Sequence, residues 1–117
     1  MWIRVAAVYG VVGVLLGAFG AHGLRDRIDA GHLATWHTAV SYQLFHSIAL
    51  LALGLFASAT NRPLGPSPWL FAIGIACFSG SLYVLALAPV RWLGPVTPLG
   101  GLLLIAGWAS LLLIPRA

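Results

Sequence analysis

Charged residues are scarce in this sequence. They make up 7% of its 117 residues and consist of six Arg and two Asp, while hydrophobic residues make up 61% and the mean hydropathy is +0.99. A soluble domain carries about 25% charged residues, so these few charges cannot cover a water-exposed surface. The composition therefore predicts an integral membrane protein instead of a soluble globular domain.

Paired cysteines and clustered positive charge are also missing. A single cysteine, Cys77, can form neither an intramolecular disulfide nor a cysteine pair for a metal. The net charge of +4 comes from dispersed arginines, no two of them closer than Arg25 and Arg27, so no basic stripe exists to follow a phosphate backbone. We expect the lipid bilayer, and no nucleic acid, as the partner of this surface.

Four long intervals carry no formal charge: residues 5–24, 30–61, 63–90 and 92–115. A helix needs about 20 residues to cross a hydrocarbon core about 30 Å thick, so each interval can hold one span. The intervals are continuously apolar instead of alternating, which excludes a β-barrel. The sequence predicts one all-α domain, an integral membrane four-helix bundle with spans at about 3–24, 34–58, 68–88 and 96–114.

Polar residues mark where these helices begin. Asp29 can cap a helix that starts near residue 30, and residues 25–33 are expected to form a short interfacial connector between the first two spans. Ser67 and Thr97 each precede a proline that suits the first position of a helix. We therefore expect both hydroxyls to cap the third and fourth spans.

The orientation of the chain depends on how arginines distribute between the two sides. Four spans place Arg4, Arg62 and Arg116 on one side and Arg25, Arg27 and Arg91 on the other. The positive-inside rule therefore gives a tie. We expect both termini to lie on the cytoplasmic side.

Small residues recur along the first span at intervals of three and four positions. They are Gly10, Gly13, Gly17 and Ala21, and two of the glycines form the small-xxx-small pattern that lets helix backbones approach closely. Such a stripe serves packing inside the bundle or a homo-oligomer interface. Packing inside the bundle is the favoured interpretation.

The histidines of the second helix do not converge on one metal. His37 and His46 project in opposite directions, His32 and His37 diverge by about 140°, and His32 and His46 are separated by about 21 Å along the axis. A metal or haem site would have to recruit His22 from the end of the first span. We expect no metal site.

His46 is the strongest candidate for function. It lies about 12 residues into its span, near the bilayer midplane, where ionisable side chains are costly and often functional. Tyr42 and Gln43 lie on the same broad side of that helix. His46 is either a neutral residue that fixes helix packing through a hydrogen bond or the polar end of a ligand pocket formed with Tyr42 and Gln43.

Groups for catalysis do not assemble within the membrane. Ser79, Ser81 and Tyr83 supply hydroxyls on the third span, but no carboxylate lies near His46 to complete a Ser-His-acid arrangement. The chain also lacks paired carboxylates, a lysine base and a phosphate-binding glycine loop. The sequence predicts that the protein is not an enzyme.

Five motifs are distinctive: GAFGAHGL at 17–24, WHTAVSYQLFH at 36–46, FSGSLY at 78–83, TPLGG at 97–101 and GW at 107–108. In this order, over nearly the whole chain, they resemble the small bacterial inner-membrane family catalogued as domain of unknown function 423. A mitochondrial relative in animals is called transmembrane protein 256. The resemblance implies a multi-pass protein of the inner (plasma) membrane with no established activity.

The matching positions are His22, Trp36, Tyr42, Gln43, His46, Ser79, Gly80, Ser81, Tyr83, Pro98, Gly100 and Gly101. His37 departs from the family pattern, because the family more often has another polar residue there. The resemblance therefore favours His22 and His46 over His37 as candidate ligand-binding residues.

Three functions are compatible with these features. The favoured one is a structural or accessory membrane component that self-associates or docks on a larger complex, as the small size and the glycine stripe indicate. The alternative is a binding module for a lipophilic ligand, a quinone or a lipid, with its polar end around His46; no other cofactor is expected. The third is a small oligomeric transporter or channel, which would need polar residues along a whole face.

Overall fold

The structure is a computed structural model that describes residues 1–114. It consists of four long helices: α1 (Trp2–His22), α2 (Ala30–Thr60), α3 (Ser67–Leu87) and α4 (Val96–Ser110). Short 3-10 helices, η1 (Arg91–Leu93) and η2 (Leu111–Leu113), flank α4. Four segments are long and apolar enough to cross a membrane: Trp2–His22, Ala30–Thr60, Ser67–Leu87 and Arg91–Leu113. The predicted all-α, four-span fold is confirmed; Arg116, counted above for orientation, lies outside the described residues.

The predicted start of the second helix near residue 30 is confirmed, and the helix extends beyond the predicted span of 34–58 at both ends. It begins at Ala30 because Asp29 caps it: the Asp29 carboxylate accepts a hydrogen bond of 2.8 Å from the backbone N–H of His32. With 31 residues, α2 is about 46 Å long and exceeds the hydrocarbon core. The connector to α1 is correspondingly shorter than the expected 25–33 segment.

The predicted caps at Ser67 and Thr97 are wrong. The residues at the cap positions of α3 and α4 are Pro66 and Pro95, and neither helix has a side-chain cap. Both hydroxyls instead join α3 to α4: Ser67 pairs with Ser110 at 2.6 Å, and Thr97 pairs with Ser81 at 2.5 Å. A hydroxyl that faces another helix in an apolar environment forms its hydrogen bond with a polar group of that helix, because no water is available.

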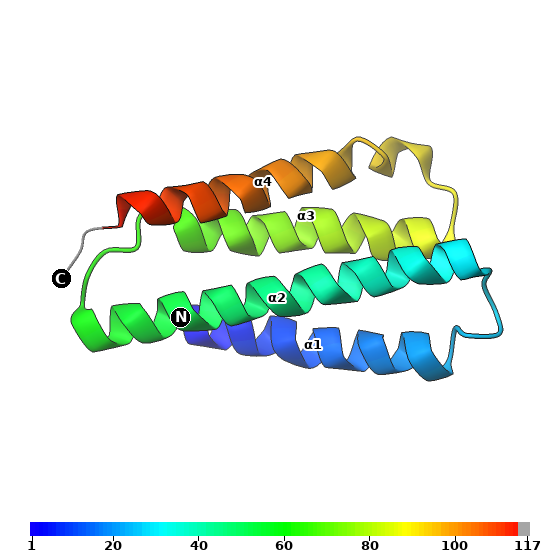
Figure 1. Ribbon diagram of the computed structural model, residues 1–117, viewed down its shortest axis with the longest axis horizontal. Coiled ribbons are helices and arrows are strands. Elements are labelled where there is room, and N and C mark those ends of the chain that lie inside the picture. The colour runs from blue at the N-terminus through cyan, green and yellow to red at the C-terminus, as the bar shows by residue number, and fades with distance from the viewer. Residues whose placement is uncertain (115–117) are drawn as a thin grey trace.

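The helices lie side by side in chain order, as Figure 1 shows, with α1 and α4 at opposite edges. The molecule measures 50 × 27 × 17 Å, so it is a flat, open arrangement. In the spans that contain α1 and α4, only 17% of the apolar stretch of each is buried inside the molecule. The corresponding share is 44% for α2 and 33% for α3. The chain begins α1 and completes η2 at the same end of the molecule.

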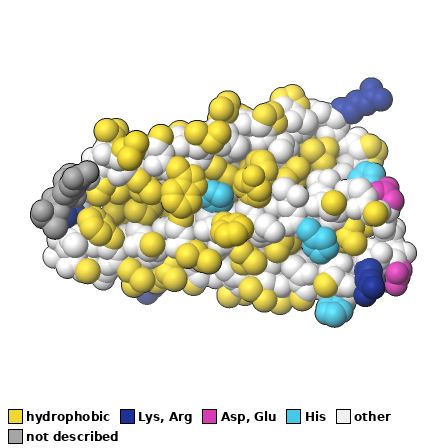
Figure 2. Space-filling view, viewed as in Figure 1, with side chains coloured by type: hydrophobic (Ala, Val, Ile, Leu, Met, Phe, Trp, Pro, Cys, Tyr) yellow, Lys and Arg dark blue, Asp and Glu magenta, His cyan; other side chains and the backbone are white. Residues whose placement is uncertain are grey.

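Close helix approach is clearest between α3 and α4. A Cβ added at Gly100 would overlap the backbone of Phe78, and one added at Gly74 would meet the Leu104 side chain at 2.7 Å. Leu104 belongs to a buried apolar cluster with Leu50, Phe71 and other residues of α1, α2 and α3. The Arg and Asp side chains visible in Figure 2 lie towards the ends of the molecule, and hydrophobic side chains cover the length between them.

Candidate functional site

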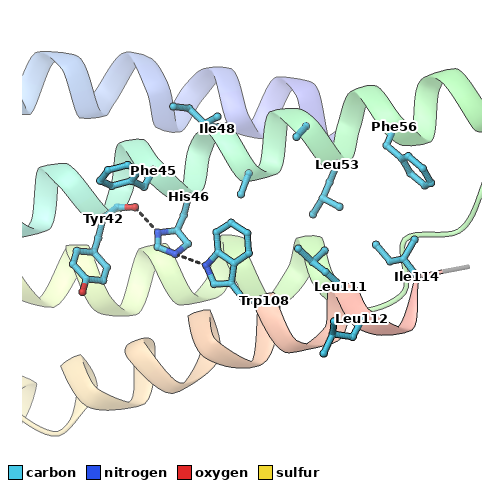
Figure 3. Close-up of a pocket in the computed structure, with 12 residues that line it drawn as sticks. Tyr42, Phe45, His46, Ile48, Leu53, Phe56, Trp108, Leu111, Leu112 and Ile114 are labelled. Carbon is cyan, nitrogen blue, oxygen red and sulfur yellow. Dashed lines mark hydrogen bonds between the residues drawn. The ribbon is translucent and has the colours of Figure 1, made fainter. Parts of the chain in front are cut away.

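An apolar groove with a volume of about 1120 Å³ runs between α2 and α4. Its walls come from α2 between Tyr42 and Phe56 and from the segment between Trp108 and Ile114. Figure 2 shows hydrophobic side chains gathered in a hollow between these helices, with a histidine beside it. Figure 3 shows this lining, with His46 and Trp108 facing each other. This groove is the main candidate for a binding site.

His46 lines the groove beside Tyr42 and is 7% exposed. Its Nδ1 lies 2.7 Å from the carbonyl oxygen of Tyr42, and its Nε2 lies 3.0 Å from Nε1 of Trp108 (Figure 3). A carbonyl only accepts and an indole N–H only donates. His46 therefore carries its proton on Nδ1 and accepts at Nε2, so it is neutral in this arrangement.

Aromatic rings surround this imidazole. Phe71, Trp108 and Tyr42 have ring centroids 5.7, 5.8 and 5.9 Å from that of His46. Trp108 also packs edge-on against Phe71 at 5.1 Å. Because both nitrogens are engaged and the ring is enclosed, His46 links α2 to α4, as the helix-packing interpretation requires.

The depth of His46 follows from the pairing of α1 with α2. A Cβ added at Gly13, which lies close to the centre of α1, would meet Leu44 and Gln43 of α2. The α2 turn that contains Tyr42 and His46 is therefore level with the middle of the first span. His46 itself contacts Phe71 near the beginning of α3 and Trp108 near the end of α4.

Gln43 points to a different side of α2 and does not line the groove. Its Nε2 donates to the backbone oxygen of Tyr9 at 2.8 Å, and its Oε1 accepts from the Tyr83 hydroxyl at 2.7 Å. Tyr9 in turn donates to the backbone oxygen of Ala72 at 2.7 Å. Gln43 is 3% exposed and joins α1, α2 and α3. The structure thus brings Tyr42 and His46 together at the groove, without Gln43.

The other histidines lie away from the groove. His22 is exposed at the end of α1, and His37 is exposed on α2. His32 pairs with Asp29, Nδ1 to Oδ2, at 2.6 Å. Hydrogen bonds from the backbone N–H and the ring of His32 hold the pKa of Asp29 below its ordinary value of 3.8. Within residues 1–114 no three His, Cys, Asp or Glu side chains come together as a metal site.

The small residues of α1 divide between two faces. Gly13 and Gly17 pack against α2, where added Cβ atoms would meet Leu44 at 2.7 Å and Val40 at 3.2 Å. Gly10 has no neighbouring atom within 4 Å of an added Cβ, and Ala21 is exposed. The stripe therefore contains two residues that pack inside the molecule and two that face outward.

Sequence reasoning missed Trp108 as the partner of His46. A signal was present, because four of the five tryptophans lie near the beginning of a span whereas Trp108 lies within the second half of the last one. An indole N–H inside an apolar span needs an acceptor within the protein. The acceptor is the imidazole of a helix that is not adjacent in the chain.

Comparison with known proteins gives consistent matches. Residues 16–101 match the family described as "Protein of unknown function (DUF423)". The chain is similar to a UPF0382 membrane protein of Staphylococcus saprophyticus, with 42% identity over 97% of this chain and 94% of the relative. Relatives in Bacillus subtilis (38% identity, 92% and 89% covered) and Schizosaccharomyces pombe (43%, 93% and 96%) are also called UPF0382 membrane proteins. No solved structure matches the chain.

Proposed function

Because this chain belongs to the DUF423 family of multi-pass membrane proteins, whose description names no activity, we propose a function from its geometry. The protein is a structural or accessory component of the membrane, not an enzyme. It self-associates or docks on a larger complex through an outer helix. The observation that carries this proposal is the outward face of α1.

That face consists mainly of small residues, and the space in front of Gly10 is open. At 100° per residue, Ala7, Gly10, Val14, Ala18 and Ala21 lie within about 80° of the helix circumference. All are exposed except Gly10, which is partly exposed and has no atom within 4 Å of an added Cβ. Small residues let a second helix approach closely in lipid, so this face suits another copy of α1 or a partner helix.

The internal polar groups support a non-catalytic role. Among residues 1–114, every buried side-chain nitrogen or oxygen has a hydrogen-bond partner. Several of these bonds join helices, such as Ser79 to the backbone oxygen of Ala39 and Trp36 to that of Leu16. These groups hold the helices together and present no free nucleophile or base to a substrate.

The test compares substitutions at two glycines that both have space for a side chain. Neither Gly10 on α1 nor Gly80 on α3 has an atom within 4 Å of an added Cβ, so Gly10→Leu and Gly80→Leu both leave the fold intact. Native mass spectrometry of gently extracted protein should show multiples of 12.3 kDa, or a complex with other subunits. Gly10→Leu should shift this assembly to monomer, while Gly80→Leu keeps it. A monomeric wild type, or an assembly that Gly10→Leu leaves unchanged, contradicts the proposal.

The groove favours a second candidate function, the binding of a lipophilic molecule such as a quinone or a lipid. It is concave and largely apolar, and it carries Tyr42 and His46 among its lining residues, which are common properties of ligand sites. A transporter or channel has less support, since the buried polar side chains are bonded between helices instead of lining one continuous face.

For location we propose the inner (plasma) membrane, with both termini in the cytoplasm. The support is that the chain begins α1 and completes η2 at the same end of the molecule. Fusions to the C-terminus test the side: green fluorescent protein should fluoresce there, and alkaline phosphatase should be inactive. The reverse pattern would place that end outside.

A further inference from the structure

We infer that a second pocket, between the start of α2 and the end of α3, binds the phosphate group of a phospholipid headgroup. The pocket has a volume of about 430 Å³ and shares no lining residue with the groove between α2 and α4. Figure 1 shows the start of α2 and the end of α3 at the end of the molecule opposite the labelled N and C. This site goes beyond the proposed structural role and does not depend on the groove.

The lining of this pocket combines polar side chains with an apolar wall. Arg27 and Asp29 line it from the segment between α1 and α2, and His32 lines it from the first turn of α2. The other lining residues are Ile28, Ala86, Leu87, Ala88 and Pro89. A phospholipid matches both parts, because its phosphate suits a basic side chain and its glycerol and first methylene groups suit the apolar wall.

The charge of Arg27 has no partner among residues 1–114, since no ion pair includes it. The Asp29 carboxylate is engaged by His32 instead: Oδ1 accepts from its backbone N–H at 2.8 Å, and Oδ2 lies 2.6 Å from its Nδ1. A guanidinium presents two parallel N–H donors that fit the oxygens of a phosphate. Arg27 is therefore the group of this pocket that is ready to bind an anion.

His32 supplies a further donor to the same pocket. Its Nδ1 faces Asp29, and no hydrogen bond within residues 1–114 uses its Nε2. A doubly protonated imidazole donates from both nitrogens, so it can bond Asp29 through one and a phosphate oxygen through the other. Asp29 then balances the charge of the imidazolium, and Arg27 remains to balance that of the phosphate.

The position of the pocket favours a lipid headgroup over free phosphate. It lies where the apolar segment Ala30–Thr60 begins and where Ser67–Leu87 ends. Figure 2 shows Arg, Asp and His side chains gathered at this end of the molecule. The ends of membrane spans meet the headgroup layer, and basic pockets between such helices bind lipid headgroups. Free phosphate would leave the apolar wall of the pocket without a partner.

The test measures lipid binding by the full chain in a neutral detergent. Wild type and variants are titrated with phosphatidylglycerol or with a diacylglycerol that carries the same acyl chains, and native mass spectrometry counts the bound molecules. Wild type should bind phosphatidylglycerol about tenfold more tightly than diacylglycerol, because only the former accepts charged hydrogen bonds. Arg27→Gln should lose this preference. Arg25→Gln should keep it, since Arg25 is exposed on the same segment but does not line the pocket.

A variant without a charge change separates the pocket from general attraction to a basic surface. Ala88→Leu keeps every charge and fills part of the pocket, so it should also weaken phosphatidylglycerol binding. Equal binding of the two lipids by wild type, or equal binding by Arg27→Gln and Arg25→Gln, overturns the inference. A loss in Arg27→Gln without one in Ala88→Leu overturns the pocket as the site. Inorganic phosphate that displaces the lipid from wild type at equal concentration overturns the headgroup as the source and keeps the phosphate site.

Discussion

The contact between Trp108 and His46 gives the most direct test of how α2 and α4 are held together. Trp108→Phe keeps an aromatic ring but removes the indole N–H that donates to His46 Nε2 at 3.0 Å. The imidazole then keeps its bond to the Tyr42 carbonyl and loses its acceptor contact. We expect α2 and α4 to be held together less firmly around the groove.

The magnitude follows from burial and from the membrane setting. Interhelical hydrogen bonds in membrane proteins contribute about 0.6 kcal/mol on average and about 1.7 at most. Leaving a buried polar atom without a partner costs about 1–3 kcal/mol, and His46 is only 7% exposed. Trp108 is 50% exposed, so exchanging its ring removes little packing. The expected loss in the free energy of unfolding is about 1–2 kcal/mol.

Reversible unfolding in mixed micelles measures this loss, and a double-mutant cycle with His46→Phe isolates the pairwise part. The coupling energy should lie at about 0.6–1.7 kcal/mol. Trp92→Phe serves as the control, because Trp92 is 73% exposed and should change stability little. Nitrogen NMR of the His46 ring should show the proton on Nδ1. A coupling energy near zero, or a proton on Nε2, would refute the reasoning.

Helix packing and capping at other positions can be checked by unfolding and exchange. Gly100→Ala should cost about 1–3 kcal/mol through overpacking against α3, whereas Gly101→Ala, with 3.7 Å to its nearest neighbour, should be tolerated; equal effects would contradict the close approach. Gln43→Leu should cost about 2 kcal/mol or more, because two polar partners lose their bonds; an unchanged unfolding energy would count against that network. The lowered pKa of Asp29 means that its cap is fully present above pH 3.8 and is lost as the pH falls through the lower pKa of the folded state. Amide exchange at His32 should accelerate over that pH range. The Asp29→Ala variant has no carboxylate to protonate, so it should not show this acceleration.

The helices were predictable because each depends on local sequence. The apolar intervals exceed the length of a span, and Asp29 is a capping residue directly before one of them. The predicted caps at Ser67 and Thr97 failed because a hydroxyl can bond its own helix or a facing one. Choosing between these partners requires knowing which helix lies opposite, and the sequence around each residue does not contain that information.

The candidate site was predictable only in part. Helical spacing places Tyr42, Gln43 and His46 within about 100° of one another, which left all three as members of one site. In the structure Gln43 forms hydrogen bonds to α1 and α3, while His46 accepts a hydrogen bond from Trp108 of α4. The division between these residues depends on which neighbour occupies which side of α2.

Composition and the length of its apolar runs determined by themselves that this chain is a four-span membrane protein, because partition into lipid sums over residues and does not depend on their neighbours. Only the tertiary structure decided the open order of the helices, the groove between α2 and α4, and the pairing of His46 with Trp108. The physical reason is that lipid and protein interior are both apolar. The sides of a helix that face them look alike in sequence, so its buried face is set by packing and by the few polar groups that must find partners.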